Sequence, residues 1–137
     1  MTCLLIGEQL LHGYDMAQAL GTEWSIEAEA ARLVVQAVLP LLPVSVDSET
    51  AKGLDATYEL TVYGGPRVIA RFRDDTASIG PTENVPVGCR LSGDPVDWLL
   101  ALYGRVDWEE LLQTGQVTVT DGDAALGAGF KRLLRNP

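Results

Sequence analysis

The fold is decided by the stretch TYELTVYGGPRVIARFR, which spans residues 57–73. Apolar and polar side chains alternate on both sides of Gly64-Gly65-Pro66, and this period of two is typical of half-buried strands. The glycine and proline residues between the two runs predict a turn. We therefore expect an antiparallel hairpin with one buried face, continued by an Asp74-Asp75 turn into a short third strand that contains Ala77 and Ile79.

Helical and strand patterns follow one another around this hairpin. A fourth strand is expected from Val87 to Leu91, after a loop from Pro81 to Pro86, and a fifth from Gln116 to Thr120. Helices are expected from Cys3 to Leu20, after Ser25, after Asp94, between Asp107 and Gly115, and after Asp121. The resulting order α-α-β-β-β-β-α-α-β-α predicts an α+β domain with helices on one face of the sheet.

Capping residues mark the ends of these helices. Gly21 is a favourable residue to end the first helix, and Ser25 is the expected N-cap of the second. Asp94 precedes Pro95, which suits the first position of a helix because proline has no N–H to satisfy. Two prolines, at positions 40 and 43, are expected to bend or end the second helix.

The composition limits the classes of function. The chain has 137 residues, 47% of them hydrophobic and 21% charged, as in one globular domain. Its formal net charge of −9 argues against nucleic acid or an anionic membrane surface as the main partner, and the simplest interpretation of the charge is solubility. Cys3 and Cys89 lie in different contexts, so we expect no disulfide framework and a reduced, cytoplasmic protein. The start MTCLLIGEQLL lacks a basic segment, so neither a signal peptide nor membrane insertion is expected.

Three polar residues of the first helix are candidates for a metal site. Glu8 and His12 are spaced i, i+4 and project from one face, with Asp15 on the same stripe. This is the spacing of half a metal site, whereas a catalytic zinc usually has three protein ligands. His12 is the only histidine, so a further nitrogen ligand would have to come from another chain, and Asp15 would support His12 as a hydrogen-bond acceptor. The alternative is a Glu-His-Asp hydrogen-bonded cluster without metal.

Bulky apolar side chains predict a layer between the helices and the sheet. Such a layer is either ordinary core or the wall of a pocket, and we expect a pocket between Trp98 and Phe130, with Trp98 and Trp108 large enough to frame it. The candidate ligand-binding residues are Tyr58, Phe72, Trp98, Leu102, Tyr103, Arg105, Trp108 and Phe130.

Arginines are the candidate ligands for an anion. Arg67, Arg71 and Arg73 share one strand face, and Arg90 lies on the fourth strand; together they are either a solvated outer face or a clamp for a carboxylate. Arg105, just after the expected helix stop, is the arginine to test first. The sequence contains no nucleophile–base pair, phosphate loop or CxxC motif, so no catalytic residue is assigned.

Two parts of the chain resemble one known family. The segment Gly7-Glu8-Gln9-Leu10-Leu11-His12-Gly13-Tyr14-Asp15 resembles the closing helix of the DinB-like metal domain in the mycothiol-dependent maleylpyruvate isomerase family. The resemblance implies that Glu8 and His12 correspond to two ligands of a divalent metal, for which that family uses a further histidine on an earlier helix. Residues 1–21 are then the remnant of such a domain.

Residues 25–137 resemble the carboxy-terminal domain of the same family, which is of the sterol-carrier-protein-two type. The matching segments are Tyr58-Glu59-Leu60, Gly93-Asp94-Pro95, Leu102-Tyr103-Gly104-Arg105 and Gln116-Val117-Thr118-Val119. This resemblance implies a five-stranded mixed, mostly antiparallel sheet with helices on one face, preceded here by an N-terminal helix pair. It also implies a hydrophobic cavity of the kind that many relatives enclose.

Taken together, these features favour a binding module for an apolar or mixed apolar–anionic small molecule, like a lipid or sterol carrier, over a complete enzyme. The alternatives are a metal-dependent isomerase or transferase fragment with an incomplete metal site, and a ligand-free accessory or dimerisation domain. No cofactor is expected, and a divalent metal is expected only if another chain completes the site. The first helix is apolar nearly all round, Leu10 included, which predicts a homodimer that pairs through this helix.

Overall fold

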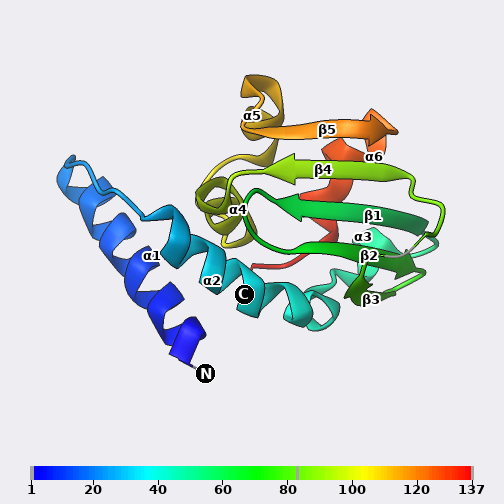
Figure 1. The fold of residues 1–137 in the computed structure, drawn as a ribbon, viewed down its shortest axis with the longest axis horizontal. Helices are drawn as coiled ribbons and strands as arrows, with labels where there is room; N and C mark the ends of the chain where they lie inside the picture. Colours follow the sequence, from blue (N-terminus) through cyan, green and yellow to red (C-terminus); the bar gives the residue numbers. More distant parts are fainter. Residues whose placement is uncertain (1, 83, 137) are drawn as a thin grey trace.

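The computed structural model describes residues 2–82 and 84–136, and its elements follow the predicted order with the addition of a short helix and two 3-10 segments (Figure 1). The elements are α1 (Thr2–Leu20), α2 (Ala28–Val38), the 3-10 helix η1 (Leu39–Ser45), α3 (Ser48–Ala51), β1 (Asp55–Val62), β2 (Arg67–Arg73), β3 (Thr76–Pro81), β4 (Cys89–Gly93), α4 (Pro95–Leu102), α5 (Trp108–Thr114), β5 (Val117–Gly122), α6 (Ala124–Gly129) and the 3-10 helix η2 (Phe130–Leu133).

The strands form one sheet in the order β3-β2-β1-β4-β5. The pair β1–β4 is parallel and the other three pairs are antiparallel, which confirms the predicted mixed, mostly antiparallel sheet. β5 runs two residues beyond the predicted end at Thr120 because a bulge opposite Arg90 and Leu91 adds one residue to its side of the ladder.

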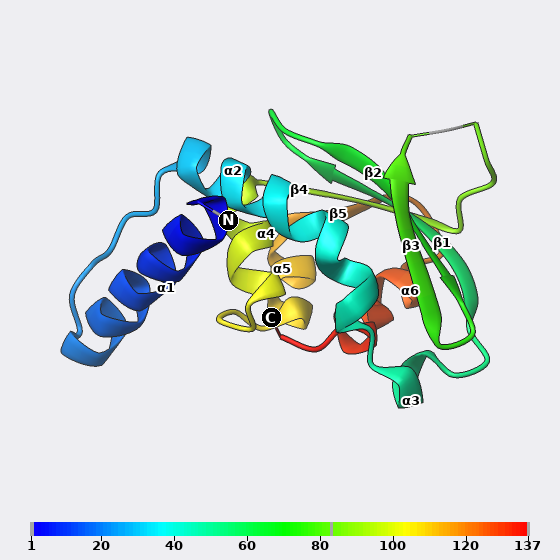
Figure 2. The ribbon, with the colours of Figure 1, turned by 90° about the horizontal axis from the view of Figure 1, so that it is seen from below.

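The helices lie on one face of this sheet, as predicted (Figure 2). Tyr58, Leu60 and Val62 of β1 point to the helices and are almost completely buried. The alternate residues, such as Thr57 and Glu59, therefore point to the other side, which we call the outer face. The functional candidates divide accordingly into a helix-side group and an outer-face group.

Two helix starts differ from the predictions. α2 begins at Ala28 after Glu27, whereas Ser25 was the expected N-cap; the segment before α2 stays extended because the Trp24 ring packs back onto Gly13 of α1. The last helix begins at Ala124, where Asp123 rather than Asp121 is the N-cap and its carboxylate accepts a hydrogen bond from the N–H of Ala125. Asp94 and Asp107, which precede two of the expected helices, are their N-caps: their carboxylates accept hydrogen bonds from the N–H groups of Val96 and Glu109.

The N-terminal helix pair is confirmed, since α1 packs against α2. Gly7 allows the close approach, because a Cβ at this position would lie 2.7 Å from Cγ1 of Val34. Cys89 is a free, buried thiol, and the side chain of Cys3 lies outside the described part of the structure.

The segment Ala28–Ser45 is long and apolar enough to cross a membrane by length and composition alone, with a mean hydropathy of 1.3. In the fold it forms α2 and then η1, where Pro40 and Pro43 replace regular α-helical bonding by a 3-10 path. Val34, Val35 and Leu39 are buried in the core, so the place of this segment in the domain accounts for its apolar composition.

Candidate functional site

Five of the predicted site residues form one aromatic cluster between the sheet and the helices. The ring of Phe130 is its centre, since it contacts the other four members of the cluster, with ring centroids 5.0 Å from Tyr58 and 5.6 Å from Trp108. The members are Tyr58, Phe72, Trp98, Trp108 and Phe130. The sequence therefore identified residues that do lie together.

The predicted opening between Trp98 and Phe130 is wrong. Both side chains are 0% exposed, and their rings meet edge to face with centroids 6.2 Å apart. Leu102 is buried beside them in the same core. Edge-to-face aromatic packing fills this space with side chains, so the centre of the cluster is ordinary core rather than a cavity.

The polar atoms at the rim of the cluster hold α6 in place. The Oη atom of Tyr58 donates a 2.9 Å hydrogen bond to the carbonyl of Leu126, and Nε1 of Trp108 donates one of 2.8 Å to the carbonyl of Gly127. Burial raises the pKa of Tyr58, which keeps its hydroxyl a proton donor. α6 and η2 together therefore form a cover that is tied to the cluster from two sides.

Two surface grooves, one on each side of this cover, end on buried members of the cluster: Trp108, which is 6% exposed, and Tyr58, which is 1% exposed. The Trp108 groove, of about 270 Å³, is lined by Gly104, Val106, Asp107, Trp108, Glu109, Ala128, Lys131 and Arg132. The Tyr58 groove, of about 170 Å³, is lined by Thr50, Leu54, Tyr58, Ala125, Leu126, Gly129, Arg132 and Leu133. Arg132 lines both grooves, and burial lowers the pKa of the neighbouring Lys131. Each groove thus combines an aromatic side chain with a cation.

Tyr103 and Arg105 lie away from the cluster, against α1. Nε and Nη2 of Arg105 donate hydrogen bonds of 3.0 and 2.8 Å to the carboxylate of Asp15. Tyr103 lines a separate groove of about 300 Å³ together with Leu4 and Glu8, and burial, followed by the charge of Glu8, raises the pKa of Tyr103. These two residues therefore connect the domain to α1 instead of lining the predicted pocket.

The residues of α1 do not fit a complete metal site. Glu8 and His12 are exposed on α1, and Asp15, the expected support for His12, is engaged by Arg105. Across residues 2–82 and 84–136, no group of three or more histidine, cysteine, aspartate or glutamate side chains is arranged to hold a metal ion. Two protein ligands are fewer than a catalytic zinc uses, so we derive no chemical step through a metal.

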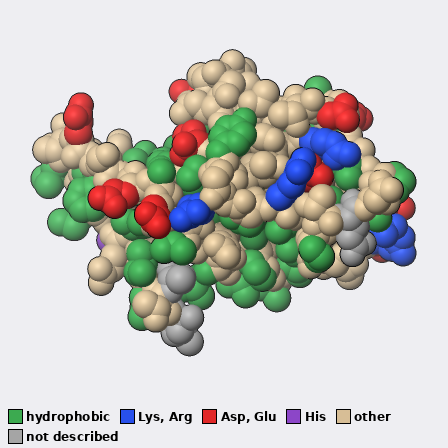
Figure 3. Space-filling view, viewed as in Figure 1, with side chains coloured by type: hydrophobic (Ala, Val, Ile, Leu, Met, Phe, Trp, Pro, Cys, Tyr) green, Lys and Arg blue, Asp and Glu red, His purple; other side chains and the backbone are tan. Residues whose placement is uncertain are grey.

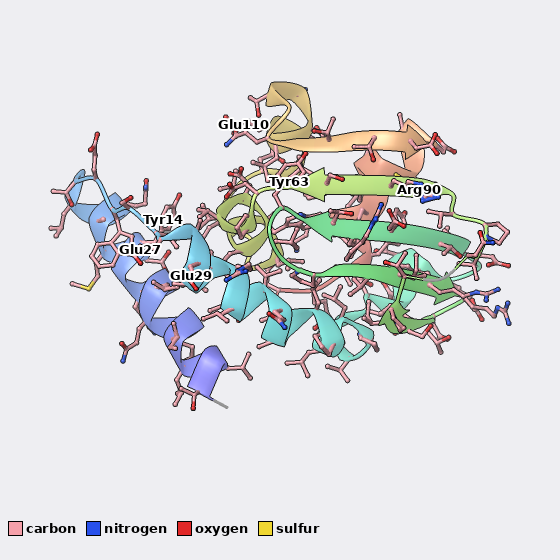
Figure 4. All side chains as sticks on the ribbon, viewed as in Figure 1. Tyr14, Glu27, Glu29, Tyr63, Arg90 and Glu110 are labelled. Atoms are coloured by element: carbon pink, nitrogen blue, oxygen red, sulfur yellow. The ribbon has the colours of Figure 1, made fainter. Side chains whose placement is uncertain are left out.

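Sequence reasoning missed Glu59, which is only 5% exposed although it lies on the outer face. Its carboxylate lies 3.3 Å from Nε of Arg67 and 3.4 Å from Nη1 of Arg90, and Arg90 also lies 3.7 Å from Asp121. Figure 3 shows basic side chains, in blue, over the strands on this face, and Figure 4 shows Arg90 on β4. The signal in the sequence was a glutamate on one strand and an arginine on each of two other strands. Only the strand register shows that these three residues are neighbours.

Comparisons with known proteins identify the family and the fold. The MDMPI C-terminal domain family matches residues 29–129. No curated protein matches the chain by sequence. The matched residues 29–129 include β1 to β5 and most of the aromatic cluster.

Several solved structures share the fold at low sequence identity. Apo sterol carrier protein 2 from Yarrowia lipolytica has 15% identity and a TM-score of 0.54 over 82% of this chain and 94% of that one. Palmitated SCP2L2 from Aedes aegypti has 19% identity and a TM-score of 0.50 over 80% of this chain and 93% of that one.

A much larger enzyme contains a similar domain. The sec-alkylsulfatase Pisa1 from Pseudomonas sp. has 15% identity and a TM-score of 0.60 over 80% of this chain, which spans only 16% of the length of the sulfatase. The shared part is thus a module of a larger protein in that case. The fold of this chain is that of sterol carrier protein 2, and by its match over residues 29–129 the chain belongs to the MDMPI C-terminal domain family.

Proposed function

We propose that this chain is a binding module for an apolar or mixed apolar–anionic small molecule, as carrier-type domains are. The observation that carries the proposal is that two surface grooves end on the aromatic cluster, one at Tyr58 and one at Trp108, and that Arg132 lines both. An arginine next to an aromatic surface suits a ligand with an acidic head and an apolar body. The fold similarity to a palmitated SCP2L2 supports this chemistry.

The filled interior favours binding at the surface. The Trp108 groove, at about 270 Å³, is slightly smaller than the roughly 300–1,000 Å³ typical of ligand pockets. We infer that the acidic group of the ligand binds Arg132, next to Lys131, while its apolar part lies on Trp108 and Val106. A long chain would reach Phe130 only if it displaced η2, which carries Phe130 on its buried side.

Tryptophan fluorescence tests this proposal with decanoate and, as its uncharged match, 1-decanol. The Trp24→Phe background removes the exposed tryptophan, so that the signal comes from Trp98 and Trp108. We expect a saturable change with decanoate, and Arg132→Gln should weaken decanoate binding about tenfold, as expected for a charged hydrogen bond. Arg73→Gln, on the outer face, is the control. Absence of saturation with both ligands, or equal affinity in Arg132→Gln, would refute the proposal.

A second candidate function is pairing with another copy of the chain. It is favoured by an exposed apolar stripe on α1 in which Leu5 is 58%, Met16 65% and Leu20 72% exposed. Monomers rarely expose such a stripe. We propose that α1 pairs with α1 of a second copy, that residues 1–21 correspond to the closing helix of a DinB-like domain, and that residues 25–137 are the carrier-type domain. We also propose a cytoplasmic location, because a free buried Cys89 suits a reducing compartment.

A further inference from the structure

A further groove lies on the outer face, away from the aromatic cluster. This outer groove, of about 410 Å³, lies between the loop after β3 and the strands β1, β2 and β3. Thr57, Ile69, Arg71 and Ser78 contribute from the strands, and Val85 and Pro86 from the loop. It shares no lining residue with the Trp108 groove or the Tyr58 groove.

The strand register arranges the polar residues of the outer groove in one row. Thr57 on β1 pairs with Arg71 on β2, and Arg71 pairs with Ser78 on β3. Neighbouring strands lie about 4.8 Å apart, so Arg71 has a hydroxyl-bearing residue as its neighbour on each side. Within the described residues, no side-chain hydrogen bond engages the Thr57 or Ser78 hydroxyl. The row therefore presents hydrogen-bond donors for which the described residues supply no side-chain acceptor.

The next row of the same face consists of Glu59, Ile69 and Gly80; Glu59 is engaged by Arg67 and Arg90, and the row is apolar and open at its other end. Ile69 pairs with Gly80, and a Cβ placed on Gly80 would meet no atom within 4 Å. Val85 and Pro86 form the opposite wall. A compact apolar body would thus fit beside the row of donors, with the isoleucine beneath it and the loop over it.

Among the described residues, Arg71 and Arg73 are the arginines of the outer face that form no ion pair, and of these two Arg71 lines the outer groove. Arg67 and Arg90 both pair with Glu59, and Arg90 pairs with Asp121 as well. Arg71 forms no ion pair with any residue in the described part of the chain. In a chain with a net charge of −9, an arginine that no described carboxylate engages, next to an apolar groove, is a group that would attract an anion.

We propose that the outer groove is a second binding site, which takes a small carboxylate with a compact apolar body. The carboxylate accepts hydrogen bonds from Arg71, flanked by the Thr57 and Ser78 hydroxyls, and the apolar body lies on Ile69 under Val85. A single guanidinium with two hydroxyls suits the one negative charge of a carboxylate. The site is independent of the helix-side grooves, because the sheet separates the two.

Methyl NMR tests the proposal with benzoate and, as its uncharged match, benzyl alcohol. We expect benzoate to shift the methyl signals of Ile69, Ile79 and Val85 saturably. Arg71→Gln should weaken this binding about tenfold, the usual effect of losing a charged hydrogen bond. Gly80→Leu should abolish it, because the added side chain occupies the open space of the groove.

Matched controls separate binding in the groove from general effects. Arg73→Gln removes the next arginine of β2, and Thr118→Leu adds the same leucine side chain on the outer face of β5; both should leave the affinity for benzoate within twofold. Equal affinity of the wild type and Arg71→Gln, or the absence of saturable shifts, would overturn the proposal. Methyl shifts confined to Val106 and Ala128, which line the Trp108 groove, would also overturn it while leaving the proposed helix-side function intact.

Discussion

Arg105 and Asp15 join two parts of the chain that are 90 positions apart in sequence, through hydrogen bonds of 3.0 and 2.8 Å from one guanidinium to both oxygens of one carboxylate. Nη1 of Arg105 also donates to the carbonyl of Tyr103, which fixes the guanidinium at the end of α4. α1 thus has a polar attachment to the domain in addition to its packing on α2. The orientation of α1 depends on this bidentate pair.

Loss of the pair should loosen α1 without unfolding the domain. We expect Arg105→Gln and Asp15→Asn each to increase amide hydrogen exchange in α1 and to leave exchange in β1 unchanged, because the pair lies at the surface and the core does not depend on it. Asp121→Asn, which removes an exposed carboxylate of the outer face, is the control. Unchanged amide exchange in α1 would contradict this prediction. Faster exchange in β1 as well would show that the core of the domain depends on the pair.

The same pair should make α1 sensitive to acid. The hydrogen bond from Arg105 lowers the pKa of Asp15 below its ordinary value. A lowered folded-state pKa gives stabilisation that is present above the unfolded pKa, about 3.9, and is lost as the pH falls through the lower folded value. Amide exchange in α1 should therefore rise below about pH 4 in the wild type, and this component should be absent in Asp15→Asn.

The Tyr58 hydroxyl should contribute to stability through α6. Tyr58→Phe removes the donor to the Leu126 carbonyl and leaves that oxygen without the bond, which should lower the free energy of unfolding by about 1 kcal/mol. Tyr63→Phe is the matched control, since Tyr63 is 53% exposed at the end of β1 (Figure 4). Urea unfolding measures both variants. Equal stability of the two would show that the hydrogen bond does not hold α6.

Cys89 should be unreactive until the domain unfolds. Its side chain is buried, and burial, followed by the charge of Asp123, raises the pKa of the thiol to about 11. In a Cys3→Ser background, which leaves one thiol, a thiol reagent at pH 8 should label the folded protein slowly and the urea-unfolded protein at once, because the thiolate is the nucleophile. Fast labelling without urea would contradict the burial of Cys89.

The same pKa shift predicts a loss of stability in alkali. A raised folded-state pKa gives stabilisation that is present below the unfolded pKa, about 8.5, and is lost as the pH rises toward the folded value. Folding stability should therefore decline between about pH 8.5 and pH 11, and Cys89→Ala should decline less. Burial also raises the pKa of Tyr58, so part of the decline should remain in that variant.

Local patterns predicted the sheet, because alternation, turns and caps are properties of neighbouring residues. The hairpin around Gly64 and the Asp94 cap are examples. The wrong predictions, such as the start of α2, concern contacts between residues that are distant in sequence. Ser25 failed as a cap because Trp24 packs on Gly13.

The residues of the aromatic cluster were predicted from the sequence, but the packing of the cluster and the ion pairs were not, because these depend on contacts between distant residues. Aromatic composition indicated which residues gather between the layers, but whether they enclose a cavity depends on the packing around Phe130, which no local pattern contains. The partners of Glu59 and Arg105 lie on other elements, so only the strand register and the position of α1 show them.

The last prediction concerns pairing through α1. Residues 5, 9, 12, 16 and 20 follow one another at spacings of three or four, so they form one stripe along the helix. Leu5, Met16 and Leu20 give this stripe its apolar character, and Figure 3 shows hydrophobic side chains along α1. Leu10, expected on the pairing face, is instead half-buried and packed against the core. The variant that tests pairing is therefore Met16→Glu.

Sedimentation at micromolar concentration should give a dimer for the wild type, because two-fold pairing would cover the stripe of each copy with that of the other. Met16→Glu should shift the equilibrium to monomer, since a carboxylate in an apolar contact lacks a partner. Tyr63→Glu, which places the same charge on an exposed apolar side chain of the sheet, should remain dimeric. If the wild type is a monomer at all concentrations while amide exchange shows an ordered α1, the stripe does not pair with a second copy. A dimer that persists in Met16→Glu but not in Tyr63→Glu would place the contact on the sheet instead.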